Sequence, residues 1–369
     1  MTKLKLCYLA SSESIHTRRW LTYFTDRGHQ VHLITLHKPV RVKGVIIHHM
    51  SSIASRYKDI AFLLNYWKIK KIVKEIKPDI LNGFFLVNYG FYAATLGYHP
   101  LVVSAFGSDV LVHPQKSRRF YRMAKFALEK ADLVTSLAKF VEKPLIALGA
   151  KPNQIVTTPL GVDKTLLEQN SQQKEINITR QVPIIISTRF LEPTYNVVLL
   201  IRALPYILSK NQAIKCLIIG GGTQMEKLRK LAKNLKLENN IEFLGTLDHD
   251  ELIRYLKMAD IFISTSLSDI NNVSLNEAMA CGLFPVCTDI PANREWIDDG
   301  INGFLVPTNS PTKLAQKILE AWQNKQLIDT ARKINWEIIQ KRALWDNNMK
   351  KIEDSYYKLL EKFKYEKSS

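Results

Sequence analysis

The chain has few cysteines and no pattern typical of a disulfide scaffold or a metal site. Its 369 residues include only four cysteines, which all lie in or beside apolar runs: Cys7, Cys216, Cys281 and Cys287. Cys281 and Cys287 are separated by five residues with no histidine close by, which excludes the common zinc-ligand spacings. Cysteine use of this kind fits a reducing compartment, so we expect a cytoplasmic protein.

Long apolar segments are also lacking. Met1 to Ala10 runs into the polar residues Ser11-Ser12-Glu13 without an apolar core, so a cleaved signal peptide is not expected. Residues 80–108 contain no Asp, Glu, Lys or Arg, a pattern that a hydropathy scan can mistake for a membrane span. Glycines and Pro100 interrupt this segment, which favours buried strands and a short helix.

Acidic residues are scarce in the first half of the chain. The whole sequence has 52 Lys and Arg against 34 Asp and Glu, a formal charge of +18. Residues 1–168 hold 25 cationic and 11 acidic side chains, whereas residues 169–369 hold 27 and 23. This asymmetry indicates an anionic partner, such as an acidic membrane surface or a nucleic acid, and the alternative is a solvated basic face.

Length and pattern predict two α/β domains. The chain exceeds the usual size of a single core, and it opens with a strand at residues 4–10, a helix at 15–26 and a strand at 30–36. The same alternation begins again at Val182, after a polar linker over residues 164–181. We therefore expect one Rossmann-like domain over residues 1–165 and a second over 182–335.

A stretch near the end of the second predicted domain suggests a ligand site. An apolar strand over residues 260–265 leads into a polar loop and then a helix from Val273 to Ala280. Such a helix points its N–H groups into the crevice at the carboxyl ends of the strands, so we expect an anion near Val273 and Ser274. Asp269 and Glu277 flank this helix start, and carboxylates beside an anion site suit neutral hydroxyl groups. A nucleotide-sugar offers both, although either acid alone is also explained as a loop acid or a helix N-terminal acid.

This stretch carries a resemblance to a known family. Seven residues separate an acid from Glu277, which is itself the first residue of Glu-Ala-Met-Ala-Cys-Gly. This pattern resembles the donor-binding signature of family 4 retaining glycosyltransferases, as do the later runs Asp289-Ile-Pro, Arg294-Glu295 and Asn302-Gly-Phe-Leu-Val. The resemblance implies the α/β GT-B architecture, two Rossmann-like domains facing across a cleft, with a C-terminal helix over residues 345–365 crossing back to the first. It also implies that Asp269, where relatives have Glu, contacts the transferred sugar and Glu277 the ribose.

The resemblance assigns further residues to the donor. Arg189 follows a strand and corresponds to an arginine on the diphosphate, and we count it with Asp109 and Asp269 as catalytic. Relatives have a lysine a few residues after the arginine, which this chain lacks. We expect the hydroxyl of Tyr195, the amide of Asn196 or an arginine from the first domain to compensate. The other donor-binding candidates are Gly222, Thr246, Leu247, Asn271, Asn272, Val273 and Ser274. Thr246 and Leu247 are the expected contacts of the nucleobase.

The first predicted domain departs from the family pattern at two places. Its first turn lacks the paired glycines of relatives and has serines, so Ser12, His16 and Arg18 are candidates for the acceptor side of the cleft. A lone histidine near a helix start is also often a plain surface residue. Relatives have a histidine near the position of Phe106, and we expect Asp109 to supply that contact with the sugar.

A basic helix in the same half suggests where the acceptor lies. Five cations interleave with four large apolar residues: Lys116, Arg118, Arg119, Phe120, Tyr121, Arg122, Met123, Lys125 and Phe126. This pattern is typical of a helix at a membrane surface, and equally of a helix that covers a sheet with its cations in water. We favour a peripheral location at the inner face of the cell membrane.

These observations predict a retaining glycosyltransferase, either hexosyl or N-acetylhexosaminyl. It would use a nucleotide-sugar, no cofactor and no metal, because Arg189 and the helix start at Val273 would stabilise the leaving diphosphate. The expected acceptor is lipid-linked or an envelope or exopolysaccharide glycan. One alternative is a catalytically weak sugar-nucleotide-binding protein. Another is a nucleic-acid-binding protein, which we do not expect because no base-reading motif is present.

Overall fold

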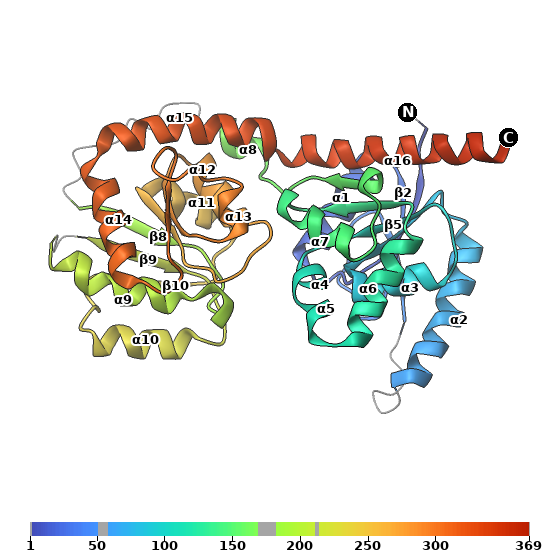
Figure 1. The fold of residues 1–369 in the computed structure, drawn as a ribbon, viewed down its shortest axis with the longest axis horizontal. Coiled ribbons are helices and arrows are strands. Elements are labelled where there is room, and N and C mark those ends of the chain that lie inside the picture. The colour runs from blue at the N-terminus through green and yellow to red at the C-terminus, as the bar shows by residue number, and fades with distance from the viewer. Residues whose placement is uncertain (1, 51–57, 169–181, 211–213, 369) are drawn as a thin grey trace. The chain divides into compact units, whose positions relative to one another are not determined.

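The computed structural model describes residues 2–50, 58–168, 182–210 and 214–368 (Figure 1). The chain forms two compact units, one of Met1–Thr158 with Asp346–Ser369 and one of Pro159–Trp345. Residues 169–181 of the predicted linker lie outside the described residues, as does the start of the helix predicted from Arg56. Each unit contains one parallel sheet with helices, so the predicted α/β class is confirmed.

The first unit has a seven-stranded parallel sheet in the order β3-β2-β1-β4-β5-β6-β7. Its strands are β1 (Lys5–Leu9), β2 (Gln30–Thr35), β3 (Val45–His49), β4 (Ile80–Phe84), β5 (Leu101–Ser104), β6 (Leu133–Ser136) and β7 (Ile155–Thr157). The uncharged segment of residues 80–108 forms β4 and β5, which are buried on both faces. Strand β3 is not predicted by the pattern, because it lies at the sheet edge and its side chains are partly exposed.

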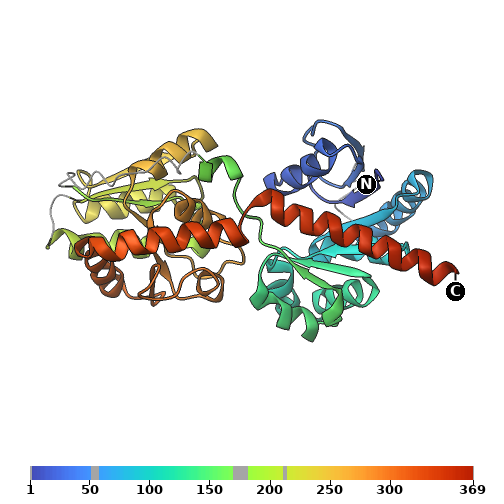
Figure 2. The same cartoon turned by 90° about the horizontal axis from the view of Figure 1, so that it is seen from above.

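Helices of the first unit are α1 (Ile15–Asp26), α2 (Lys58–Ile76), α3 (Gly90–Thr95), α4 (Ser108–Leu111), α5 (His113–Lys116), α6 (Arg118–Lys130), α7 (Glu142–Ala147) and the long α16 (Trp345–Ser368). Figure 2 shows α16 running along the first unit. The ring of Tyr356 stacks on Phe24, with centroids 5.5 Å apart, and its hydroxyl accepts a 2.7 Å hydrogen bond from Asn82.

Glu353 fixes α16 further, because its buried carboxylate accepts from His29 at 2.9 Å and pairs with Arg27 at 2.7 Å. Burial acts to raise the pKa of Glu353, but the hydrogen bonds from His29 and Tyr23 and the charge of Arg27 lower it. The C-terminal helix is therefore held on the first unit by the contacts of the buried Glu353 carboxylate as well as by apolar packing.

The second unit has a six-stranded parallel sheet in the order β10-β9-β8-β11-β12-β13. Its strands are β8 (Ile184–Ser187), β9 (Lys215–Ile219), β10 (Ile241–Gly245), β11 (Ile261–Ser264), β12 (Phe284–Thr288) and β13 (Phe304–Val306). The chain builds outward from β8 to β10 and then returns to the other side of β8 with β11. The strand order thus reverses between β8 and β11, where open α/β sheets usually bind ligands.

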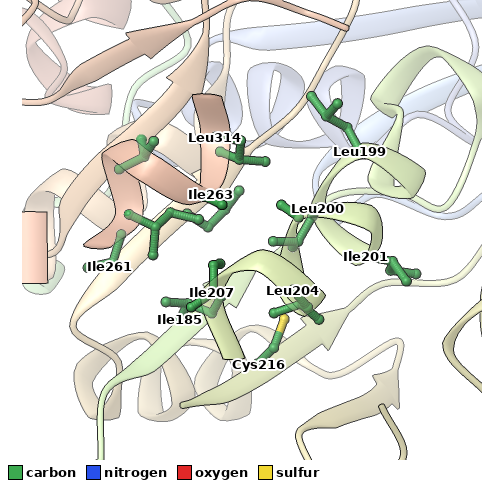
Figure 3. Close-up of a cluster of buried hydrophobic side chains, with 14 of the residues drawn as sticks. Ile185, Leu199, Leu200, Ile201, Leu204, Ile207, Cys216, Ile261, Ile263 and Leu314 are labelled. Carbon is green, nitrogen blue, oxygen red and sulfur yellow. The ribbon is translucent and has the colours of Figure 1, made fainter. Parts of the chain in front are cut away.

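Six longer helices cover the two faces of this sheet (Figure 1). One face carries α9 (Val197–Leu208), α10 (Met225–Asn234) and α14 (Pro311–Gln323), and the other α11 (His249–Met258), α12 (Val273–Ala280) and α15 (Lys325–Arg342). Figure 3 shows Leu200, Leu204 and Ile207 of α9 packed against Ile185 and Ile263 of the strands. Two short helices, α8 (Lys164–Glu168) and α13 (Pro291–Arg294), complete the unit.

Helix α15 is an element that the sequence reading missed. Its signal was present, since Asn324 caps the helix start by accepting from the amide of Leu327 at 3.0 Å, and buried residues follow at helical spacing. All four cysteines are buried and free. Among the described residues, no helix is both long and apolar enough to cross a membrane.

Candidate active site

The reversal of strand order in the second unit brings two loops together. The loop after β8 carries Arg189, Tyr195 and Asn196, and the loop after β11 carries Asp269 and leads into α12. Both loops leave the carboxyl ends of adjacent parallel strands, so their side chains meet at one sheet edge. Most of the residues predicted to bind the donor lie at this edge.

Arg189 is the centre of this edge. Its guanidinium forms an ion pair with Asp269, donates from Nη1 to Oδ1 of Asn272 at 2.7 Å, and stacks on the ring of Tyr195 at 4.4 Å from the centroid. The residue is only 8% exposed, and a cation so buried needs a compensating charge. Asp269 supplies that charge, so the two residues that the sequence reading assigned to diphosphate and sugar are paired with each other.

Asn272 connects Arg189 to the framework of the unit. It is fully buried and caps α12, because its Oδ1 also accepts from the amide of Leu275 at 3.1 Å. Its Nδ2 donates to Ser264 at 3.2 Å and to Asn293 at 3.1 Å. The sequence reading named Asn272 as a donor contact and missed this role, which a capping residue in front of a helix could have suggested.

The loop after β8 is fixed at several points. The carbonyl of Tyr195 accepts from Thr265 at 2.9 Å, and the carbonyl of Thr194 accepts from the amide of Leu267 at 2.8 Å. Asn196 has left-handed backbone angles, φ 47° and ψ 40°, which asparagine tolerates better than most residues. Tyr195, at the place of the missing lysine, therefore holds its ring against Arg189 in a defined position.

The glycine turn after β9 has a packing role. Gly220 and Gly222 have positive φ angles of 141° and 155°, and a Cβ on Gly222 would lie 2.5 Å from the carbonyl of Leu191. A Cβ on Gly220 would collide with the carbonyl of Arg189. Side chains are thus excluded here because the turn packs directly on the loop that carries Arg189, whereas the donor contact expected of Gly222 stays a prediction.

Glu277 lies within α12, and Thr246 and Leu247 follow β10. The Glu277 side chain is 12% exposed, and its Oε1 is 3.2 Å from Nε2 of His249, at the start of α11. Thr246 is exposed, whereas Leu247 packs partly into the core beneath α11 and α12. His249 was not among the predicted residues, although it lies close to Thr246 in sequence.

The start of α12 makes hydrogen bonds within the unit. The amide of Val273, predicted to face an anion, donates to the carbonyl of Asn271 at 2.9 Å, and the anion expected near Val273 and Ser274 stays a prediction. The hydroxyl of Ser274 donates to the carbonyl of Thr188 at 3.1 Å. Nearby, Thr188 Oγ1, Arg189 Nε and Asn271 Nδ2 are buried and have no partner among the described residues. Such atoms favour a bound ligand or water as their partner.

Asp109 in the first unit needs a correction. Its carboxylate is fully buried and accepts from the amides of Leu86 at 2.9 Å, Phe106 at 3.1 Å and Gly107 at 2.5 Å. Burial raises the pKa of Asp109, and these hydrogen bonds oppose the rise. The carboxylate holds two loops together and is not placed to contact a sugar.

The first turn of the first unit is also held internally. The hydroxyl of Ser12 accepts from the amide of Val40 at 2.8 Å, and Arg18 donates to the carbonyls of Ser12 and Glu13 at 2.8 Å each. Arg18 therefore stabilises the turn. His16 is partly buried, and burial, with a smaller effect of Arg19, lowers its pKa. An acceptor contact by His16 stays a prediction.

Among the residues that the structure describes, no three or more His, Cys, Asp or Glu side chains group to hold a metal ion. The absence of a metal from the reaction stays a prediction.

Comparison with known proteins identifies the family. Residues 168–337 match the family model described as glycosyl transferases group 1, and residues 5–137 match that of the glycosyl transferase 4-like family. The chain is a glycosyltransferase. An uncharacterized glycosyltransferase of Methanocaldococcus jannaschii is 27% identical over 80% of this chain and 82% of its own. N-acetyl-alpha-D-glucosaminyl L-malate synthase of Bacillus anthracis is 23% identical over 91% of both chains.

Solved structures of glycosyltransferases share the fold. A glycosyltransferase from Rickettsia africae superposes with a TM-score of 0.80 at 19% identity, covering 98% of this chain and 99% of that one. Anabaena HepE, solved with UDP, has a TM-score of 0.79 at 16% identity, covering 96% and 100%. The similarity to these structures confirms the GT-B fold. The matches to the two family models confirm the family resemblance seen in the sequence.

Replacing the two acids separately should distinguish their roles in this glycosyltransferase. Glu277→Ala should weaken a nucleoside diphosphate and its sugar derivative alike, by about tenfold, because a charged hydrogen-bond acceptor for ribose is lost. Asp269→Ala should cause such a loss only for the sugar derivative. Isothermal titration calorimetry with both ligands measures this, and equal losses for both ligands in both variants would contradict the assignment.

Removing the buried arginine should impair turnover. Arg189→Ala should lower kcat by about 10²–10³-fold at saturating donor, since the cation expected at the leaving diphosphate is lost. Arg189→Lys should recover only part, because lysine lacks the planar fork. Arg229→Ala is the matched control, since Arg229 also stacks on a ring, that of Phe243, but is exposed on α10. Wild-type kcat in Arg189→Ala would remove this residue from the mechanism.

Proposed function

We propose that this glycosyltransferase moves a hexosyl or N-acetylhexosaminyl group from a nucleotide-sugar to an acceptor with retention of configuration, without a metal or a cofactor. The observation that supports it most is the meeting of Arg189, Asp269 and Asn272 at the reversal of strand order, with Glu277 one helix turn on. This set combines a cation for phosphate with acceptors for hydroxyl groups.

Each residue has a distinct part in the proposed reaction. Arg189 and the positive end of α12 stabilise the negative charge that grows on the departing diphosphate. Glu277 accepts hydrogen bonds from the ribose and Asp269 from the transferred sugar, while Thr246 and Leu247 border the nucleobase. Because Tyr195 has no charge, Arg189 has to act without the second cation that relatives provide.

Known proteins of similar sequence or fold support this class of donor. HepE has been solved with UDP-glucose, and a Corynebacterium glutamicum relative, 25% identical over 52% of this chain, is named a GDP-mannose-dependent mannosyltransferase. Both a uridine and a guanosine donor therefore need testing.

Relatives also favour an envelope acceptor. A Salmonella typhimurium relative, 27% identical over 60% of this chain and 53% of its own, is named a putative colanic acid biosynthesis glycosyltransferase. The Corynebacterium relative is named for a phosphatidylinositol mannoside, a lipid. We infer a lipid-linked or envelope glycan acceptor for this chain, met at the inner face of the cell membrane.

A donor panel tests the proposal directly. The panel contains uridine and guanosine nucleotide-sugars that carry glucose, galactose, mannose or N-acetylglucosamine. Only the correct donor should raise the melting temperature of the protein, because a ligand that binds the folded state alone stabilises it. Hydrolysis or transfer of that donor then separates an enzyme from a catalytically weak binding protein. No stabilisation by any nucleotide-sugar would contradict the proposed function.

Helix α6 supports the membrane part of the proposal, with one correction. Arg118, Arg119, Arg122 and Lys125 are exposed, and Tyr121 is 41% exposed among them. The two phenylalanines, however, pack inward, with Phe120 against His113 and Phe126 against Phe91. The exposed side of α6 is thus cationic with one aromatic ring, and the interleaving in the sequence mostly reflects the two sides of an ordinary amphipathic helix.

Charge reversal on α6 should abolish binding to anionic vesicles. Each cation near such a surface contributes about 1 kcal/mol, so replacing Arg118, Arg119 and Arg122 with Glu should eliminate cosedimentation with phosphatidylglycerol vesicles at low salt. Donor binding should persist. The control replaces three exposed lysines of α10 with Glu: Lys227, Lys230 and Lys233. A wild type that ignores these vesicles would refute membrane docking.

A further inference from the structure

The partners of Arg189 differ in how firmly they are anchored. Apart from its bond with Arg189, the Asn272 side chain forms three hydrogen bonds, which cap α12 and reach Ser264 and Asn293. The backbone of Tyr195 is fastened to the loop after β11. Both would keep the guanidinium in place if its third partner left.

Asp269 is the partner that can leave. It lies within the polar loop after β11, beside the exposed residues Leu267 and Ser268. One carboxylate oxygen pairs with Arg189, and the other accepts from the amide of its own neighbour, Ile270, at 2.7 Å. Among the described residues, the Asp269 side chain forms no hydrogen bond to another element apart from the one with Arg189, so a rotation of this side chain leaves the sheet and α12 intact.

A diphosphate should bind the guanidinium of Arg189 more strongly than the carboxylate of Asp269 does. It carries more negative charge than a carboxylate, and guanidinium groups bind phosphate oxygens through two N–H donors at once. Arg189 Nε and the adjacent Thr188 Oγ1 are buried and have no partner among the described residues. A phosphate oxygen would give these atoms the hydrogen bonds that Asp269 does not provide.

We propose that Asp269 is the counter-ion that the donor diphosphate displaces from Arg189, and that the freed carboxylate then accepts hydrogen bonds from the sugar. This inference rests on the proposed function. Its consequence is a coupling between the two halves of the donor: a nucleoside diphosphate alone must break the pair, whereas the intact nucleotide-sugar gives Asp269 new partners. The site would thereby discriminate against the nucleoside diphosphate product.

The alternative is that Asp269 stays on Arg189 as a permanent clamp. The two ideas predict opposite signs for one measurement. If the diphosphate displaces Asp269, removing the carboxylate charge removes a competitor, so a nucleoside diphosphate binds more tightly. If Asp269 is a clamp, the same change misplaces Arg189 and the nucleoside diphosphate binds more weakly.

Calorimetric titration of UDP, GDP and inorganic pyrophosphate into Asp269→Asn tests the proposal. Asparagine keeps the size of the side chain and an oxygen for Arg189 but removes the charge. We expect whichever of UDP or GDP binds the wild type to bind about tenfold more tightly, the low end of what close charge pairs contribute. The gain should vanish when Arg189→Ala is added.

Glu242→Gln is the matched control, because it removes the same charge from the exposed pair with Lys215, which joins β10 to the first residue of β9. It should leave nucleotide affinity unchanged, which excludes an effect of net charge. Thermal unfolding verifies that each variant folds, and Asp269→Ser replaces Asp269→Asn if the latter does not.

Unchanged or weaker binding of the nucleoside diphosphate by a folded, uncharged variant would overturn the displacement of Asp269 while leaving the proposed function intact. A wild type that binds no nucleotide would instead overturn the proposed function. In that case tighter binding of pyrophosphate by Asp269→Asn would still support displacement of Asp269 by an anion, and unchanged or absent pyrophosphate binding would count against it.

Discussion

A buried guanidinium must be given both a negative charge and hydrogen bonds, and the sheet edge at the carboxyl ends of β8 and β11 is built around that requirement. Arg189 obtains its charge from Asp269, a hydrogen bond from Asn272 and a stacking surface from Tyr195. Asn272 caps α12 and the backbone of Tyr195 is tied to the loop after β11, whereas Asp269 otherwise bonds within its own loop among the described residues. The position of one cation therefore depends on β8, β11 and α12 together.

The order of the parallel strands makes this convergence possible. Because β11 returns to the free side of β8, the loops after these two strands leave the same edge side by side. The glycine turn after β9 then packs against the loop that carries Arg189, at a distance that excludes side chains. Backbone packing, and not a direct ligand contact, is the physical reason that this structure gives for glycine at these positions.

The departures from the family pattern can be understood in the same terms. A lysine at the position of Tyr195 would bring a second positive charge, whereas the tyrosine ring supports the guanidinium through its face without adding charge. The remaining cation is then balanced by a single nearby carboxylate. In the first unit, the carboxylate of Asp109 is likewise occupied by its neighbours, because it accepts hydrogen bonds from backbone amides of two separate segments.

The sequence by itself determined the α/β alternation, many of the strand and helix bounds, the family, and most of the residues that meet at the carboxyl ends of β8 and β11. Helices such as Val273–Ala280 were readable because their apolar spacing is a local property. The edge strand β3 was not, because a short strand with partly exposed side chains has no clear period. Only the tertiary structure decided that Asp269 pairs with Arg189 and that Asp109 binds backbone amides. These partners are 80 and 23 residues apart in the chain, and such contacts depend on strand order, which no local pattern of residues records.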